Sequence, residues 1–278
     1  MTQNDISLVA LTLGIVKNEE RNQIEHFVQQ AWADAGISPS FLYFSTKEDA
    51  FRAITEGEIA ACACFLDSTP TSLPLGLVIT ALSERKVTNN CLVAKNTEGV
   101  LFSEKTDVRV LAFSDINRAQ MQYLQPNFTV EMADLTPLES LEKLNSNIYD
   151  AVVLSQNDVN VLDLQANEWQ IQPFSVREFI PKAGQGVTCF ISAEDDLPTR
   201  RLLKEAHHPS VSAVTNIERT IQKMLNQHEV SAYCERDRMG NYHLWAAALV
   251  NNDFKKIRFS QSTTFGMAEN AVQQLLSA

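Results

Sequence analysis

Residues Arg177 to Asp196 read REFIPKAGQGVTCFISAEDD, and this stretch carries the strongest indication of the fold. Phe179-Ile180-Pro181 is an apolar approach to a turn, Gly184-Gln185-Gly186 supplies the turn, and Val187 to Ile191 is a β-rich run of strand length. A Gly-Gln-Gly turn also occurs in many unrelated loops. This stretch is therefore evidence for the fold only together with the segments on either side of it.

Strand and helix patterns alternate along the chain, which predicts an α/β protein with largely parallel sheets. The expected strands are Leu8–Val16, Phe41–Phe44, Ile59–Phe65, Val108–Phe113, Phe128–Met132 and Ala151–Leu154. The expected helices are Asn22–Ala35, Lys47–Thr55, Ile116–Leu124 and Leu138–Leu144. Two βαβ units in tandem predict two lobes with a ligand cleft beyond the carboxyl ends of the strands.

The pattern changes after about Pro198. Helices are expected over Arg200–Ala206, Ser212–Gln227 and Ala268–Leu276, with strands over Val230–Glu235 and His243–Val250. These elements predict a third, smaller α+β domain.

The passage from Arg177 to Asp196 resembles the segment F-L-P-A-x-G-Q-G-A-x-x-I-E-x-R-x-D-D of hydroxymethylbilane synthase, also called porphobilinogen deaminase. Further segments agree with that family in order and spacing: Glu56 to Ile59, Pro70 to Leu77, Leu141 to Leu144, Tyr149 to Leu154, Asn216 to Arg219 and Leu244 to Val250. The resemblance covers the chain from about Leu13 to Val250.

The resemblance implies two lobes like those of periplasmic binding proteins, with the Gly-Gln-Gly segment returning to the first lobe. We expect residues 1–97 with 178–197 to form the first α/β lobe and residues 98–177 the second. Residues 198–278 are then the C-terminal α+β domain.

The family's reaction requires a cysteine in the third domain, which holds a dipyrromethane cofactor through a thioether. In register with that family's loop, Glu229 stands at the cysteine position, and Gln227 and His228 replace two glycines. Cys234 lies five positions later within a strand pattern, and buried structural thiols are typical of such positions. The role of the altered loop from Gln227 to Glu229 is open.

The family's catalytic aspartate, in H-S-x-K-D-x-P, falls on Ser68, and the lysine before it falls on Asp67. These two residues are the weak catalytic candidates. The arginines that bind substrate carboxylates in the family are replaced, and Arg118 is one residue out of register, about 100° around a helix. Thr46 and Lys47 match the family's T-K-E, so we expect ligand contacts from Thr46, Lys47, Arg118 and Gln185.

Composition limits the class of function. The chain has 278 residues, a formal net charge of −11 and a pI near 4.9, which argues against binding nucleic acid or acidic membranes. The N-terminus has the pattern of a first strand and not of a signal peptide. Five cysteines, mostly in apolar runs, indicate reduced thiols in a cytoplasmic protein, and Cys62-Ala63-Cys64 lacks the second half of a zinc site.

The framework of the family is retained while its reactive positions are changed together. We therefore expect a porphobilinogen-deaminase-like protein without deaminase activity, without a cofactor or metal, that binds an unknown small molecule or protein partner between its lobes. The alternative is an active, divergent hydroxymethylbilane synthase of tetrapyrrole biosynthesis that carries dipyrromethane. A third reading is an enzyme of another reaction type that uses Lys47, Asp67 or Ser68.

Overall fold

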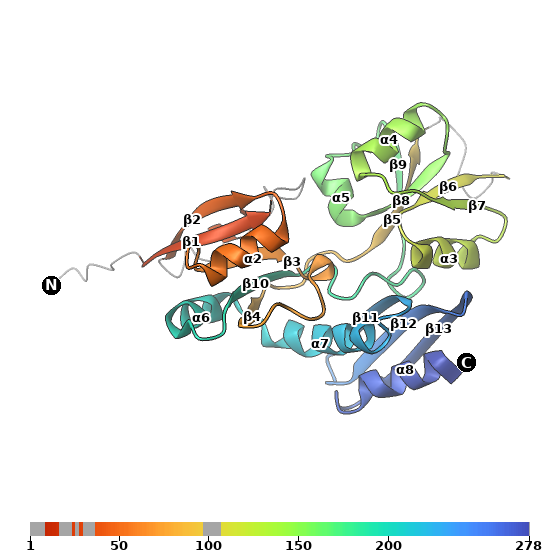
Figure 1. Cartoon of the computed structure of the whole chain (residues 1–278). Coiled ribbons are helices and arrows are strands. Elements are labelled where there is room, and N and C mark those ends of the chain that lie inside the picture. The colour runs from red at the N-terminus through yellow and green to blue at the C-terminus, as the bar shows by residue number, and fades with distance from the viewer. Residues whose placement is uncertain (1–8, 17–23, 26–27, 30–36, 97–106, 278) are drawn as a thin grey trace. The chain divides into compact units, whose positions relative to one another are not determined.

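The computed structural model describes residues 9–16, 24–25, 28–29, 37–96 and 107–277. The chain divides into two compact units (Figure 1). The first unit comprises Met1–Lys86 and Gly186–Ser212, and the second comprises Val87–Gln185 and Ala213–Ala278. The chain therefore passes between the units in the middle of the Gly-Gln-Gly segment.

The first unit is built on a five-stranded sheet with the order β2-β1-β3-β10-β4. Its strands are β1 Val9–Val16, β2 Ile37–Phe44, β3 Ala61–Phe65, β4 Leu77–Leu82 and β10 Thr188–Ala193. Strand β1 is parallel to β2 and β3, whereas β10 is antiparallel to β3 and β4. The helical segments of this unit include α2 Lys47–Thr55, η1 Leu66–Ser68, α6 Leu197–Leu203 and η3 Lys204–Ala206.

Helix α2 has the bounds that its sequence predicts. Thr46 is the N-cap residue, with its side chain accepting a hydrogen bond from the Asp49 amide. Four residues of the helix, Ala50, Phe51, Ala53 and Ile54, are buried, and they pack with thiols of β3 and β10 in one core cluster. The helix ends just before Gly57, whose φ of 74° suits glycine.

The second unit repeats the scheme with the strand order β7-β6-β8-β5-β9. Its strands are β5 Asn90–Lys95, β6 Arg109–Ala112, β7 Thr129–Met132, β8 Ala151–Ser155 and β9 Trp169–Pro173, and its helices are α3 Asp115–Leu124, α4 Pro137–Asn145 and α5 Gln156–Val161. Strand β6 is parallel to β7 and β8, so the second predicted βαβ unit is confirmed. The α/β fold class is confirmed with it, but the expectation of largely parallel sheets is wrong, because each five-stranded sheet has two parallel and two antiparallel pairs of strands.

A three-stranded antiparallel sheet, β11-β12-β13, completes the second unit. Its strands are β11 Glu229–Arg236, β12 Tyr242–Val250 and β13 Asp253–Gln261. Helices α7 Pro209–Met224 and α8 Met267–Ser277 cover one face (Figure 1). The other face packs through Trp245 and Ala247 on Ile116 and Ile180 of the same unit.

The domain boundaries differ from those expected in three places. Residues 90–95 form β5, which pairs with β8 and β9 and so belongs to the second sheet. Residues 178–185 also group with the second unit, and residues 198–212 with the first. The small C-terminal sheet shares the second unit and is not a separate compact unit.

The sequence patterns did not predict β4, β5, β9, β13 or α5. The expected helix over Asn22–Ala35 lies mostly outside the described residues, although residues 24–25 and 28–29 are helical. Among the described residues, no helix combines the length and the apolar character that crossing a membrane requires.

The Gly-Gln-Gly turn depends on its glycines. Gly184 and Gly186 have φ values of 80° and 79°, a conformation that residues with a Cβ rarely adopt. Between them, Gln185 is buried, and so are Phe179 and Ile180 before the turn. This local geometry explains why the stretch from Arg177 to Asp196 is such a clear feature of the sequence.

Candidate functional site

One group of predicted residues lies at the carboxyl ends of β2 and β3 in the first unit. Thr46 begins helix α2, and its hydroxyl also donates to the Asp49 carboxylate at 2.7 Å. The next residue, Lys47, donates from its ammonium group to the backbone carbonyl of Ser68. The fold therefore brings Thr46, Lys47 and Ser68 to one edge of the sheet, where open α/β sheets bind ligands.

The two catalytic candidates, Asp67 and Ser68, lie in the single turn η1 that follows β3. The Ser68 hydroxyl is exposed and donates to the Phe65 carbonyl at 3.0 Å. A hydroxyl does not exchange a proton near neutral pH as a carboxyl group does, so Ser68 is a poor substitute for a catalytic acid. Asp67 is partly exposed and supplies a carboxylate one residue away.

Gln185 has a structural role in the second unit. Its side-chain nitrogen donates to the Thr88 carbonyl at 2.8 Å, and its side-chain oxygen accepts from the Lys182 amide at 3.1 Å. The residue is only 6% exposed. Both ends of the amide are thus used within the protein, which does not support the expected ligand contact.

The second unit contains a cavity of about 450 Å³. It is lined by charged, amide and imidazole side chains and one leucine: Asp115, Arg118, Gln227, His228, Glu229, Leu249, Asn251 and Asn252. The cavity therefore joins the predicted ligand residue Arg118 to the altered loop that begins at Gln227. The Arg118 guanidinium pairs with the Asp115 carboxylate at 2.6 Å, so part of its charge is already compensated.

The residues of this cavity do not fit the attachment of a dipyrromethane by a thioether. Glu229, which the resemblance puts at the position of the family's cysteine, lines the cavity, and no cysteine is among the lining residues. Cys234 lies five residues further along β11, about 16 Å away at the usual rise of a strand. Alternation along the strand also places Glu229 and Cys234 on opposite faces.

Cys234 has a structural environment. It is 1% exposed and packs with Leu244, Ile221 and other residues in the core between the small sheet and its helices. Its backbone amide donates to the Glu218 carboxylate at 2.7 Å. These contacts support the expectation of a buried structural thiol.

Two residues stabilise helix α4 within residues 134–141, the segment that by the resemblance stands where the family has substrate-binding arginines. Glu139 forms a capping box with Thr136, and hydrogen bonds from the Thr136 amide and hydroxyl lower the pKa of the Glu139 carboxyl. Ser140 is fully buried, and its hydroxyl donates to the Pro137 carbonyl. Glu139 and Ser140 therefore both form hydrogen bonds that stabilise the first turn of helix α4.

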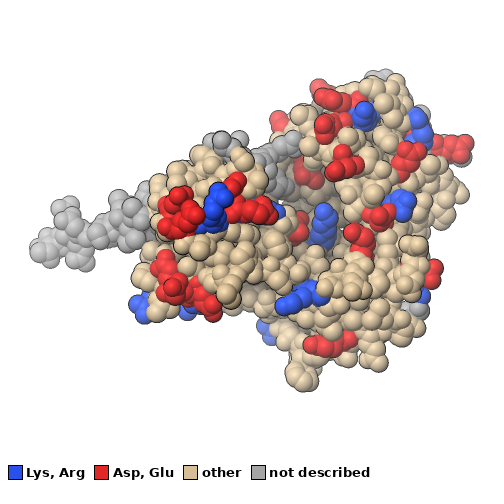
Figure 2. Space-filling view, viewed as in Figure 1, with Lys and Arg blue, Asp and Glu red and all other residues tan. Residues whose placement is uncertain are grey.

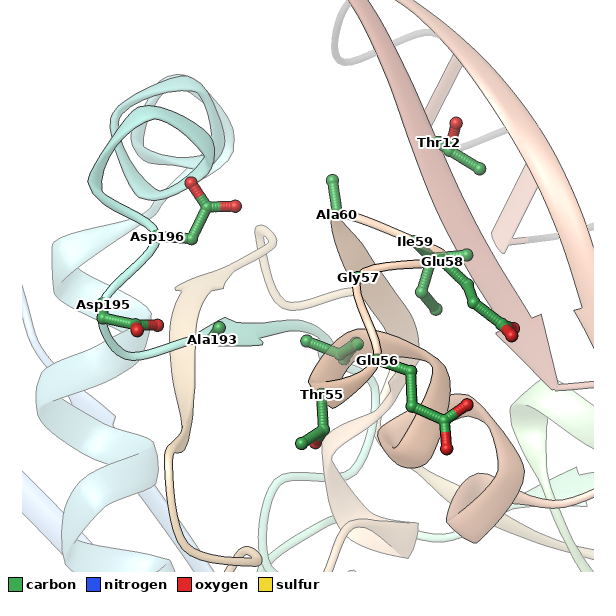
Figure 3. Close-up of a pocket in the computed structure, with 11 residues that line it drawn as sticks. Thr12, Thr55, Glu56, Gly57, Glu58, Ile59, Ala60, Ala193, Asp195 and Asp196 are labelled. Atoms are coloured by element: carbon green, nitrogen blue, oxygen red, sulfur yellow. The ribbon is translucent and has the colours of Figure 1, made fainter.

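A second cavity, of about 580 Å³, lies in the first unit at the amino end of β3. It is lined in part by the carboxylates of Glu56, Glu58, Asp195 and Asp196. Figure 3 shows that the Glu56 and Glu58 side chains point away from Asp195 and Asp196, so the four carboxylates do not converge. Asp196 also caps helix α6, where it accepts from the Thr199 amide at 3.1 Å.

Among the described residues, no group of three or more His, Cys, Asp or Glu side chains is suited to holding a metal ion. Over the face seen in Figure 2, lysines and arginines are interspersed with acidic side chains. This mixed distribution agrees with the net charge of −11.

The sequence patterns did not reveal that Asp115, Asn251 and Asn252 take part in the second-unit cavity. The Asn-Asn pair was a usable signal, because both asparagines have positive φ values, 53° and 68°, in the turn between β12 and β13. The approach of this hairpin to the start of α3 has no comparable signal in the local sequence.

The chain is similar to a protein family and to several known proteins of that family. A model of the family "Porphobilinogen deaminase, dipyromethane cofactor binding domain" matches residues 46–201, more than half of the chain. Porphobilinogen deaminase of Chlorobium phaeobacteroides is 26% identical over 204 residues, covering 72% of this chain and 63% of that protein. The match thus spans less than two thirds of the length of that relative.

Porphobilinogen deaminase of Streptococcus sanguinis is 26% identical over 231 residues, covering 81% of this chain and 74% of that protein. Among solved structures, the periplasmic VFT2 domain of Bordetella pertussis BvgS has a TM-score of 0.47 and 14% identity, covering 78% of this chain and 92% of that domain. This structural similarity is too low to serve as evidence for the fold, which is described by the sheet order given above. The family match over residues 46–201 shows that this chain belongs to the porphobilinogen deaminase family.

Proposed function

We propose that this member of the porphobilinogen deaminase family does not catalyse the deaminase reaction and instead binds a small polar ligand or a protein partner through the second-unit cavity. The observation that carries the proposal is the position of Glu229. This carboxylate lines the cavity at the family's cofactor position, and the Cys234 thiol lies on the opposite face of β11.

The charges in the cavity also support this proposal. Porphobilinogen carries two carboxylates per ring, so a growing pyrrole chain requires several fixed cations. The cavity instead combines Arg118 with the carboxylates of Asp115 and Glu229. These carboxylates repel an anionic substrate, because like charges at short range raise its free energy of binding.

The lining suggests a different class of ligand. Carboxylate oxygens accept hydrogen bonds, the Arg118 guanidinium donates them, and the amides of Gln227, Asn251 and Asn252 do both. We infer a small polar ligand that carries donors as well as acceptors. A volume of about 450 Å³ is at the lower end of ordinary ligand cavities.

The first test addresses the deaminase reaction. The purified protein is treated with Ehrlich's reagent to detect a bound dipyrromethane, and porphobilinogen consumption is measured in parallel. We expect a negative colour reaction and no turnover. A positive colour reaction with turnover supports the alternative, an active divergent hydroxymethylbilane synthase, and refutes the proposal.

The second test addresses the cavity. Small polar compounds, with anionic pyrroles included, are screened by thermal shift, because a ligand selective for the native state raises its stability. For any compound that binds, Arg118→Gln is expected to weaken binding. Arg109→Gln is the matched control, since Arg109 is also exposed and paired, with Asp150 at 3.6 Å, but does not line the cavity.

The outcomes distinguish the kinds of partner. A compound that shifts the wild type and the Arg109→Gln variant but not Arg118→Gln supports binding at the cavity. Equal binding by both variants places the ligand elsewhere and contradicts this part of the proposal. If the panel shifts nothing, a protein partner is favoured over a small ligand.

We infer that the protein works in the cytoplasm without a bound cofactor. The cytoplasmic location is supported by five cysteines, an odd number that lie mostly in apolar runs, and the absence of a cofactor is supported by Glu229 at the position that the resemblance gives to the family's cysteine. Mass spectrometry of the intact native protein tests the cofactor part, since a covalent dipyrromethane adds its mass to that of the chain.

A further inference from the structure

A pair of thiols lies across two strands of the first unit. Strands β3 and β10 are antiparallel, and their register sets Cys64 directly opposite Cys189. The two sulfur atoms are 3.6 Å apart. Both residues are buried, with exposed fractions of 3% and 0%.

The backbone geometry at this position is compatible with a disulfide. The Leu66 amide donates to the Val187 carbonyl at 2.9 Å, and hydrogen-bonded pairs recur every second residue of an antiparallel ladder. Cys64 and Cys189 are therefore such a pair, for which Cα atoms lie about 5.5 Å apart. Disulfides form at Cα separations of about 4.4–6.8 Å, and closing the bond brings the sulfurs about 1.5 Å nearer.

The surroundings of Cys64 favour its thiolate form, which is the nucleophilic form of a cysteine. A hydrogen bond from Cys189 lowers the pKa of the Cys64 thiol, and the nearby Cys62, Thr69 and Lys47 act in the same direction against the effect of burial. The Thr69 hydroxyl oxygen lies 3.3 Å from the sulfur of Cys64 and 3.3 Å from that of Cys189. By contrast, hydrogen bonding to Cys64 and burial raise the pKa of Cys62.

We propose that Cys64 and Cys189 form an oxidation site at which a peroxide produces a disulfide between β3 and β10. The Cys64 thiolate attacks one oxygen of hydrogen peroxide, and the O–O bond breaks to give a sulfenic acid and hydroxide, which takes up the proton that the Cys64 thiol released and becomes water. The Cys189 thiol then attacks the Cys64 sulfur, the S–O bond breaks, and the proton leaves with the hydroxyl group as water. Two thiols are oxidised and one peroxide is reduced to two molecules of water.

The burial of the pair decides which oxidant suits it. Larger disulfide reagents do not reach sulfurs with 3% and 0% exposure without an opening of the sheet. Hydrogen peroxide has only two heavy atoms and needs a much smaller opening. Because β3 runs directly into the turn that carries Asp67 and Ser68, the bond would join β10 to the strand that supports this edge.

Cys62 provides an internal control. It lies on the same strand and, two residues before Cys64, on the same face. In the register of the two strands, however, it stands opposite Ile191 and not opposite a cysteine. If these thiols were buried by packing alone, peroxide would show no preference for oxidising Cys64 and Cys189. The proposed site instead predicts that Cys62 is not oxidised.

The experiment treats the native full-length protein with hydrogen peroxide, blocks remaining thiols in denaturant, and maps tryptic peptides without reduction. The sequence gives peptides 53–85, with Cys62 and Cys64, and 183–200, with Cys189. We expect these two peptides to be joined with the loss of two hydrogens, and the link to disappear with dithiothreitol. Fragmentation of the joined peptide is expected to place the bond on Cys64.

Variants sharpen the result. Cys62→Ala is expected to leave the yield of the joined peptide unchanged, and Cys189→Ala to abolish it, with circular dichroism as the check on folding. Cys64 or Cys189 oxidised to sulfinic acid without a joined peptide overturns the proposal, and so does a Cys62–Cys64 bond. These outcomes are read on the wild type, so the test holds even if a variant fails to fold.

Discussion

A substitution at Glu218 tests which hydrogen bonds stabilise the Gly-Gln-Gly segment, in which the chain passes from the second unit to the first. This residue of helix α7 is fully buried. One carboxylate oxygen accepts from the Gly184 amide at 2.8 Å, and the other accepts from the Cys234 amide at 2.7 Å. The Glu218 side chain thus links the Gly-Gln-Gly segment to the small C-terminal sheet through two hydrogen bonds.

The substitution Glu218→Gln keeps the shape of the side chain but leaves one oxygen to serve two donors. The new NH₂ group faces a backbone N–H, so one buried donor loses its partner. Such a donor costs about 1–3 kcal/mol, and a hydrogen bond to a charged group contributes about 1.5–3 kcal/mol. Removal of the buried charge offsets part of this loss, so we expect the free energy of unfolding to fall by about 2–3 kcal/mol.

The assay is urea unfolding followed by tryptophan fluorescence. Trp169 and Trp245 lie in β9 and β12, so both report on the second unit. The control is Glu142→Gln, an exposed position of helix α4, for which a change within about 0.5 kcal/mol is expected. If Glu218→Gln also changes the free energy of unfolding by less than about 0.5 kcal/mol, the reasoning from these two hydrogen bonds is refuted.

Three further predictions concern local features. Burial, with the charges of His208 and Lys204, lowers the pKa of His207, whose Nδ1 accepts from the Leu82 amide at 3.2 Å. As the pH falls, His207 is therefore protonated in the unfolded chain before it is protonated in the folded chain. Its contribution to the free energy of unfolding is complete above about pH 6.5 and is lost as the pH falls through the lowered pKa of the folded state. The variant His207→Asn keeps a hydrogen-bond acceptor that does not titrate. Between pH 8 and pH 5 its melting temperature should fall less steeply than that of the wild type. Equal slopes of melting temperature against pH would exclude His207 as the cause of the acid destabilisation. Gly186→Ala places a Cβ at φ 79° and should cost about 1–2 kcal/mol in urea unfolding, and no change would contradict the need for glycine there. Thr136→Ala removes the N-cap of α4 and should cost about 1 kcal/mol by the same measurement, unless the capping box contributes nothing.

The regular elements could be predicted largely from local patterns. Helix α2 has the expected bounds because Thr46 caps its start and Gly57 follows its end. Strands β3 and β8, each parallel to one neighbour and antiparallel to the other, are continuous apolar runs, as expected for strands buried on both faces. Strands β4 and β5 were missed although they too are apolar and follow turn residues, such as Gly76 with its φ of 82° directly before β4.

The candidate site could be predicted only in part. Lys47 and Ser68 were identified one by one, and the fold brings them together at the ends of β2 and β3. Arg118 was identified without its cavity, because the loop at Gln227 and the turn at Asn251 lie more than 100 residues further along the chain. Gln185 was expected to bind a ligand, yet its amide holds the backbone at Thr88 and Lys182.

The amino-acid sequence alone predicts the family and the α/β class, and the resemblance puts Glu229 and Ser68 at the positions of the family's cysteine and catalytic aspartate. Caps, turns and apolar periodicity act over a few residues, so they can be recognised in a single segment. The pairing of Cys64 with Cys189, 125 residues apart, and the meeting of Arg118 with the loop at Gln227 in one cavity required the folded chain. Both depend on which elements become neighbours, and that follows from the packing of the whole fold and not from any one segment.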